Sequence, residues 1–149
     1  MIRLSRLFVL AGFVLGFVRL SAAESMNMKG DMKPEILSAC VKVSAALAAD
    51  DLAATKKAAA TVAEHARMSD DKDIAVKADA VAAADKIEAA RDNFKALSAV
   101  VEPLAAGDKN YVVMNCPMAD ADWVQAKGPT KNPYFGKAML TCGSPKRTK

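Results

Sequence analysis

Aromatic side chains and histidines are scarce in this sequence. Phe, Trp and Tyr make up 5% of the 149 residues, and His65 is the one histidine. A hydrophobic core therefore has to be built mainly from Ala, Val, Leu and Met, and a zinc site with several histidine ligands is excluded. Neither glycine nor proline occurs from Glu35 to Glu102, where alanine dominates. Because the two main helix breakers are missing there, this stretch favours α-helix.

Several signatures of catalysis and of nucleic-acid binding are also missing. The sequence has no C-x-x-C pair, no Ser/His/Asp set and no glycine-rich phosphate loop, so we do not expect an enzyme. The net charge of +4 includes Arg3, Arg6 and Arg19 near the N-terminus, and the rest of the chain is close to neutral. Without a basic stripe, nucleic-acid binding is not expected.

The N-terminal segment has the pattern of a secretory signal peptide. Two arginines precede the apolar run Leu7–Val18, which is shorter than the ~20 residues needed to span a bilayer. Small residues follow at 21–23, so we predict cleavage before Glu24, export to the periplasm and no stable membrane insertion after residues 1–23 are removed. An uncleaved anchor is the alternative, although Arg19 closes the apolar run early.

The region 34–106 predicts an all-α fold, an antiparallel four-helix bundle. Apolar residues recur at three- and four-residue steps along it, most clearly between Ile87 and Leu104. Pro34 suits the first turn of helix one, and helix breaks are predicted at Asp50-Asp51 and at 69–71, where side chains can cap the next helix. A further break is expected near 84–85, with one long helix as the alternative.

The bundle is flanked by two segments of different character. Residues 24–33 are expected to be a flexible, methionine-containing leader. Residues 107–149 are expected to be an ordered segment rich in Pro, Gly and aromatic residues and packed on the bundle, since Trp123 and Tyr134 argue against disorder. A short extended piece at Tyr111–Val113 and a helical turn at Lys137–Leu140 are predicted within it.

The C-terminal segment gathers two cysteines and two methionines. Pro117 fixes the backbone between Cys116 and Met118. Met139 and Cys142 are three residues apart, which puts them on one side of a helical turn. Thiolates and thioethers are soft donors, and thioethers are poor zinc ligands, so these four residues predict a site for Cu(I) or Ag(I).

The same cysteines permit other interpretations. Cys116 and Cys142 would also suit a disulfide, worth roughly 3–4 kcal/mol through lost chain entropy in the unfolded state, or remain inert thiols. On the residue pattern alone, the metal site and the disulfide are equal alternatives. Cys40 lies on an apolar helical stripe and is expected to be a buried thiol rather than a ligand.

A longer pattern surrounds these cysteines. It comprises Cys116-Pro117-Met118-Ala119, Ala121-Asp122-Trp123, Asn132-Pro133-Tyr134-Phe135-Gly136, Met139-Leu140 and Cys142-Gly143, preceded by Arg91-x-x-Phe94-x-x-Leu97-Ser98. This pattern resembles the C-terminal signature of a domain of uncharacterised function, found in exported bacterial proteins and on periplasmic adaptor subunits of copper and silver efflux systems. The resemblance covers most of the chain after the leader and is specific over the last thirty-odd residues.

The resemblance implies a helical bundle, a link to copper or silver handling, and a ligand role for Cys116, Met118, Met139 and Cys142. The chain lacks the strands and long hairpin expected of an adaptor subunit, so a role inside an efflux pump is not implied. We expect Trp123, Asn132 and Tyr134 to shape the site.

Two weaker soft-metal sites are also predicted. Met26, Met28 and Met32 form M-x-M-x3-M in the leader, where a plain disordered segment is an equal alternative. His65 and Met68 are three residues apart on helix two, although a lone histidine there is more often only solvated or hydrogen-bonded.

The predicted function is therefore a periplasmic Cu(I)- or Ag(I)-binding protein that sequesters the ion or passes it to a copper-export or chaperone protein, with metal resistance as the outcome. The alternatives are a disulfide-stapled helical interaction domain without metal and a thiol–disulfide redox protein.

Overall fold

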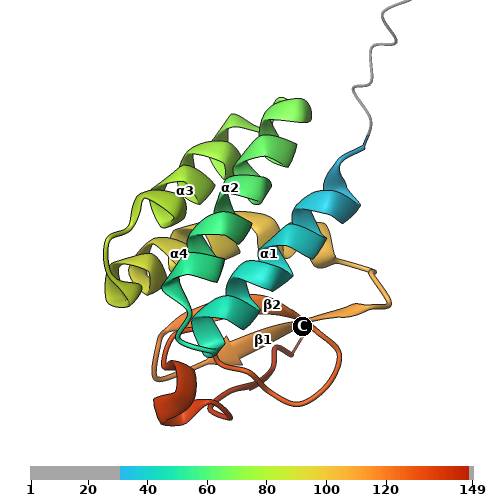
Figure 1. Cartoon of the computed structure of the whole chain (residues 1–149). Helices are drawn as coiled ribbons and strands as arrows, with labels where there is room; N and C mark the ends of the chain where they lie inside the picture. Colours follow the sequence, from blue (N-terminus) through green and yellow to red (C-terminus); the bar gives the residue numbers. More distant parts are fainter. Residues whose placement is uncertain (1–30, 148–149) are drawn as a thin grey trace, which may run out of the picture.

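The computed structural model describes residues 31–147, so the predicted signal peptide and most of the predicted leader lie outside it. Within this range the elements, drawn in Figure 1, are α1 (Lys33–Ala48), α2 (Leu52–Met68), α3 (Lys72–Ala83), α4 (Ile87–Val101), the 3-10 helix η1 (Glu102–Ala105), β1 (Tyr111–Cys116), β2 (Ala121–Ala126), the 3-10 helix η2 (Gly136–Met139) and β3 (Ser144–Pro145). No helix among these residues has the length and apolar character needed to cross a membrane.

The four α-helices are separated by short links that contain helix caps. The Asp51 carboxylate accepts the N–H of Ala54 at 2.9 Å at the start of α2, and Asp71 accepts the N–H of Ile74 at 3.1 Å at the start of α3. These caps satisfy backbone donors that have no partner within the first helical turn. The backbone at Ala84 is extended, which separates α3 from α4. The predicted helix breaks are confirmed, and one continuous helix is excluded.

The C-terminal part of the chain forms a three-stranded antiparallel sheet in the order β2-β1-β3. The all-α prediction is therefore wrong, and the protein is mixed α/β. Strand β1 contains the extended piece predicted at Tyr111–Val113 but continues to Cys116, and β2 and β3 had no predicted counterpart. Residues with low strand propensity, among them Asn115 and Asp122, weaken the alternating pattern of these strands.

A buried aromatic cluster joins the sheet to the helices. Phe94 lies on α4, Trp123 on β2 and Tyr134 in the loop before η2. The ring centroids of Phe94 and Tyr134 are 6.0 Å apart, and those of Trp123 and Tyr134 are also 6.0 Å apart with the rings nearly perpendicular. Edge-to-face arrangements at this separation are favourable beyond the apolar area that they bury. The few aromatic residues of the chain therefore fix the C-terminal segment to the bundle.

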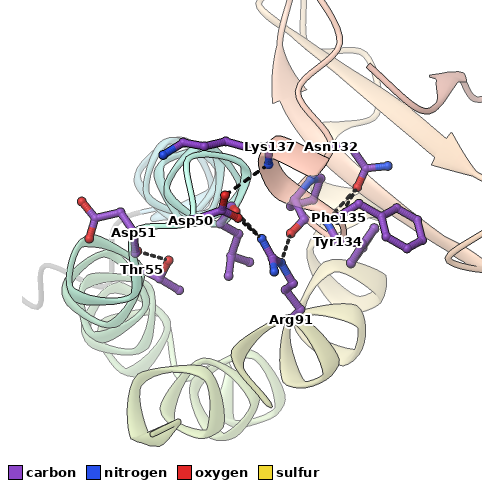
Figure 2. A network of polar contacts seen from close by, with 10 residues as sticks. Asp50, Asp51, Thr55, Arg91, Asn132, Tyr134, Phe135 and Lys137 are labelled. Atoms are coloured by element: carbon purple, nitrogen blue, oxygen red, sulfur yellow. Dashed lines mark hydrogen bonds and ion pairs between the residues drawn. The ribbon is translucent and has the colours of Figure 1, made fainter. Parts of the chain in front are cut away.

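Arg91 on α4 makes a second connection between the bundle and the loop before η2. Figure 2 shows its guanidinium between the end of α1 and this loop. It forms an ion pair with Asp50 and donates hydrogen bonds to the carbonyl of Leu47 at 3.1 Å and to that of Pro133 at 3.0 Å. The Asp50 carboxylate also accepts the N–H of Lys137 at 3.3 Å. The pKa of Asp50 is held below its usual value, chiefly by the hydrogen bond from Arg91.

A substitution at Gly136 tests the contact between Arg91, Asp50 and the loop before η2. The φ of Gly136 is +55°, in the left-handed region, and an added Cβ would collide with both Asp50 and Arg91. We expect Gly136→Ala to lower the free energy of unfolding by roughly 2–4 kcal/mol. Gly107→Ala is the matched control, because φ there is +78° and no atom lies within 4 Å of the added Cβ. Its expected loss is only about 1 kcal/mol. Urea denaturation measures both, and equal losses would contradict this account of the loop.

Candidate metal centre

The hairpin formed by β1 and β2 places Cys116 and Met118 at its tip. Cys116 pairs with Ala121 as the last pair of the register. Within the tight turn between them, the N–H of Ala119 donates to the carbonyl of Cys116 at 3.2 Å, and Asp120 adopts a left-handed φ of +47°. The side chain of Cys116 is buried, whereas Met118 is 66% exposed at the tip of the turn.

Strand β3 returns the chain to β1 and brings Cys142 to the same tip. Ser144 pairs with Asn115, one residue before Cys116, and the N–H of Lys146 donates to the carbonyl of Val113 at 2.9 Å. This register is antiparallel, so Cys142, two residues before Ser144, lies beyond the end of β1.

Two further residues, Gly143 and Lys146, hold the segment around β3 in place. Gly143 has a φ of +127°, and a Cβ there would lie 2.6 Å from the Trp123 ring, so only glycine fits. The ammonium of Lys146 contacts Glu102 at 2.6 Å and Asp122 at 2.7 Å. Its hydrogen bonds to Asp122 and then to Glu102 raise the pKa of Lys146 to about 12. The two Lys146 contacts hold the segment around β3 against η1 and β2.

Three sulfur atoms meet at the hairpin tip. The Sγ atoms of Cys116 and Cys142 are 3.4 Å apart, and Cys142 Sγ lies 3.9 Å from Met118 Sδ. Both cysteines are free thiols. Sulfur atoms that share one metal ion through bonds of about 2.3 Å lie roughly 4 Å apart in a trigonal arrangement. The two separations measured from Cys142 are therefore close to those of a soft metal site and need small side-chain adjustments.

Asn132 holds this arrangement from the interior. Its fully buried side chain donates a hydrogen bond to the carbonyl of Cys142 at 2.6 Å and accepts the N–H groups of Tyr134 at 2.7 Å and Phe135 at 3.2 Å. Its own N–H donates to the carbonyl of Leu140 at 2.8 Å. A buried amide with this many partners determines the local backbone, because each lost partner would leave a buried polar group unpaired.

The two thiols of the site have opposite pKa shifts. Burial raises the pKa of Cys116, but hydrogen bonds from the N–H of Ala119, from Cys142, from Asn132 and from the N–H of Met118 outweigh burial and lower it below the ordinary value. The pKa of Cys142 is raised, first by its hydrogen bond to Cys116 and then by burial. In the reduced pair, Cys116 is therefore the thiol that loses its proton first as the pH rises.

Met139, the fourth predicted ligand, is not part of the sulfur contacts. It lies half-buried in η2, the predicted helical turn, and its carbonyl accepts the N–H of Cys142 at 3.1 Å. Among residues 31–147, the sulfur–sulfur contacts connect Cys116, Cys142 and Met118 and do not include Met139.

The other predicted site residues are scattered. Met26 and Met28 lie outside the described residues, whereas Met32 is half-buried at the start of α1. On α2, Met68 is 49% exposed. His65 is half-buried, and its Nδ1 has no hydrogen-bond partner among the described residues.

Cys40, as predicted, is a buried thiol rather than part of the site. It is completely buried in the core, and this burial raises its pKa to about 12. Cys40 therefore has little thiolate character and is chemically inert compared with Cys116 and Cys142.

The donor set restricts which metals fit. Within the described range 31–147, no group of three or more His, Cys, Asp and Glu side chains is placed to hold a metal ion. A zinc or calcium site of the usual composition therefore has no counterpart there, whereas two thiols and a thioether suit a soft monovalent ion.

The sequence pointed to the sulfur residues and to Asn132, Trp123 and Tyr134 as residues that shape the site, but not to the ion pairs of Lys146 or the tight packing of Gly143. The Asp122–Lys146–Glu102 contacts and the close approach of Gly143 to Trp123 depend on the sheet. No local pattern in the sequence signals this pairing, because β3 is only two residues long.

Comparison of this chain with known protein families, with curated proteins and with solved structures gives no match.

The pKa of Cys116 provides a test of the site geometry. We expect the thiolate absorbance of the reduced protein to show a first step below the ordinary cysteine range. Asn132→Asp keeps an acceptor for the N–H groups of Tyr134 and Phe135, but it removes a donor and adds negative charge beside the thiolate. This first step should then move to higher pH. Cys116→Ser, the control, should abolish it, and an unchanged step in Cys116→Ser would contradict the assignment.

Proposed function

We propose that this protein is an exported carrier of Cu(I), with Ag(I) as an alternative cargo, and that Cys116, Cys142 and Met118 bind the ion. The observation that carries the proposal is the convergence of these three sulfur atoms, with separations of 3.4 and 3.9 Å, at one hairpin tip. Cys142 lies 26 residues after Cys116 in the sequence. Three features of the fold bring these residues together: the β1–β2 turn, the β1–β3 pairing and the Asn132 side chain.

The composition of the site supports a soft monovalent ion. Thiolates and thioethers select Cu(I) over the harder divalent ions, which prefer oxygen and nitrogen donors. Both thiols must lose their protons to bind the ion as thiolates, and the lowered pKa of Cys116 makes this step easier there than at Cys142, whose pKa is raised. Affinity should therefore weaken as the pH falls and the thiolates become protonated.

The exposure of the site supports transfer of the ion rather than permanent burial. Met118 is largely exposed and Cys142 is half-buried, so a ligand from a partner can reach the ion from solvent. A hollow of about 300 Å³ lies beside Met118 and is lined by side chains that include Arg91, Tyr134 and Phe135. This surface suits contact with a copper-export or chaperone protein of the periplasm, the compartment that the N-terminal pattern predicts.

Competition of the reduced protein with a chromophoric Cu(I) chelator tests the proposal. We expect one tightly bound ion per chain. Cys116→Ser and Cys142→Ser should each weaken binding by at least about 100-fold, and Met118→Leu by about tenfold. Met68→Leu is the matched control, because Met68 is also an exposed methionine but lies on α2. The Met68→Leu protein should bind Cu(I) as tightly as the wild type.

Three outcomes of this titration would alter the proposal. If Met118→Leu and Met68→Leu behaved alike, the thioether would not be a ligand. If the reduced wild-type protein failed to compete, soft-metal binding would be rejected and a disulfide-stapled domain would remain. Met139→Leu completes the set, because a loss as large as that of Met118→Leu would add Met139 as a fourth ligand.

A further inference from the structure

The two thiols of the site are close enough to react with each other. Their Sγ atoms are 3.4 Å apart, and a disulfide bond is about 2.05 Å long. Both backbones are already fixed, Cys116 by the β1–β2 register and Cys142 by the hydrogen bond from Asn132 to its carbonyl. Bond formation therefore requires side-chain rotation and a small approach rather than rearrangement of the sheet.

The two sulfurs differ in their access to solvent. Cys116 is completely buried, whereas Cys142 is half-buried at the surface of the hairpin tip. A molecule arriving from solvent therefore meets Cys142 first. The buried Cys116 lies directly behind it, in hydrogen-bond contact. An accessible thiol with a second thiol at contact distance is the arrangement that thiol–disulfide exchange uses, with one sulfur entering and the other resolving.

We propose that Cys116 and Cys142 form a reversible dithiol–disulfide couple that opens and closes the metal site, with Cys142 as the entering sulfur and Cys116 as the resolving sulfur. The couple itself stands on the geometry of the two thiols. Its role as a gate for the metal rests on the proposed function.

The chemistry uses a small disulfide, RSSR, as the oxidant. Cys142 gives up its proton and its thiolate attacks one sulfur of RSSR, which forms a Cys142–SR mixed disulfide and releases RS⁻. The Cys116 thiolate then attacks the Cys142 sulfur, forms the Cys116–Cys142 bond and displaces a second RS⁻. Two protein thiols are oxidised by two electrons, RSSR is reduced to two thiols, and the protons of the protein thiols pass to the two RS⁻ groups.

Oxidation would remove both thiolates from the site at once. Only the thioether of Met118 would remain of the three converging donors, and a neutral thioether alone is a weak ligand. The reduced protein would then bind the ion and the oxidised protein would release it. The fold would change little between the two states, because the β1–β3 pairing is already formed with free thiols.

Equilibration of the protein with mixtures of reduced and oxidised glutathione tests the couple without metal. Each cysteine lies on a separate tryptic peptide, since lysines separate all three in the sequence. Mass spectrometry after acid quenching should find the Cys116 and Cys142 peptides linked in oxidising mixtures and separate in reducing ones. The buried Cys40 is the internal control and should stay unmodified. A pair that never links, or a link that excess reduced glutathione cannot reverse, would overturn the proposal.

Two single variants test the order of attack. Cys116→Ser removes the resolving sulfur, so a glutathione adduct should accumulate on Cys142. Cys142→Ser leaves the buried Cys116 as the remaining thiol of the pair, and it should acquire at least tenfold less adduct. The reverse pattern would overturn the assignment of the entering sulfur, and equal labelling would overturn the argument from exposure.

Measurements of Cu(I) binding in the two redox states distinguish a failure of the redox couple from a failure of the proposed carrier function. Chelator competition with reduced and fully oxidised protein should show tight Cu(I) binding only in the reduced form. If the pair cycles with glutathione but neither form binds Cu(I), the couple stands and the carrier function fails. If both forms bind equally well, the carrier function stands with other ligands and the gate is rejected.

Discussion

The hydrogen bond from the Asn132 side chain to the carbonyl of Cys142 connects the parts of the chain that make the site. The oxygen of the same buried amide accepts the N–H groups of Tyr134 and Phe135. One side chain therefore holds both the loop before η2 and the segment that leads into β3. Cys142 then lies against Cys116 and Met118 without a covalent link. Loss of this side chain would leave several buried backbone groups unpaired.

The rest of the fold supports that amide from two sides. The rings of Phe94 and Trp123 both pack on Tyr134, two residues after Asn132, and so join α4 and β2 to the loop. Arg91 binds the neighbouring carbonyl of Pro133 and the end of α1. The helices therefore act as a rigid support for a small sheet whose hairpin tip carries the reactive side chains. In this way an alanine-rich bundle with few reactive side chains of its own can position the sulfur site.

How far the sequence predicts the structure depends on the range of the interactions. Helix breaks were predictable, because Asp51 and Asp71 cap helices within three residues of their own position. The sheet was not, because β3 is two residues long and pairs with a strand about thirty residues earlier in the sequence. Residue types alone pointed to Cys116, Met118 and Cys142 as a soft-donor set, but their separations needed the pairing of β3 with β1. Met139 was grouped with them on a spacing argument, and among the described residues its hydrogen bond to the site runs from the Cys142 N–H to its carbonyl.

The proposed metal site requires the three sulfur atoms at the hairpin tip to act as a single ligand set. X-ray absorption spectroscopy at the copper edge of the Cu(I)-loaded protein tests it most directly. We expect only sulfur in the first coordination shell, with about three neighbours near 2.3 Å, and a clear loss of sulfur scattering in Cys142→Ser. A shell that contains nitrogen or oxygen, or one that Cys142→Ser leaves unchanged, would contradict it.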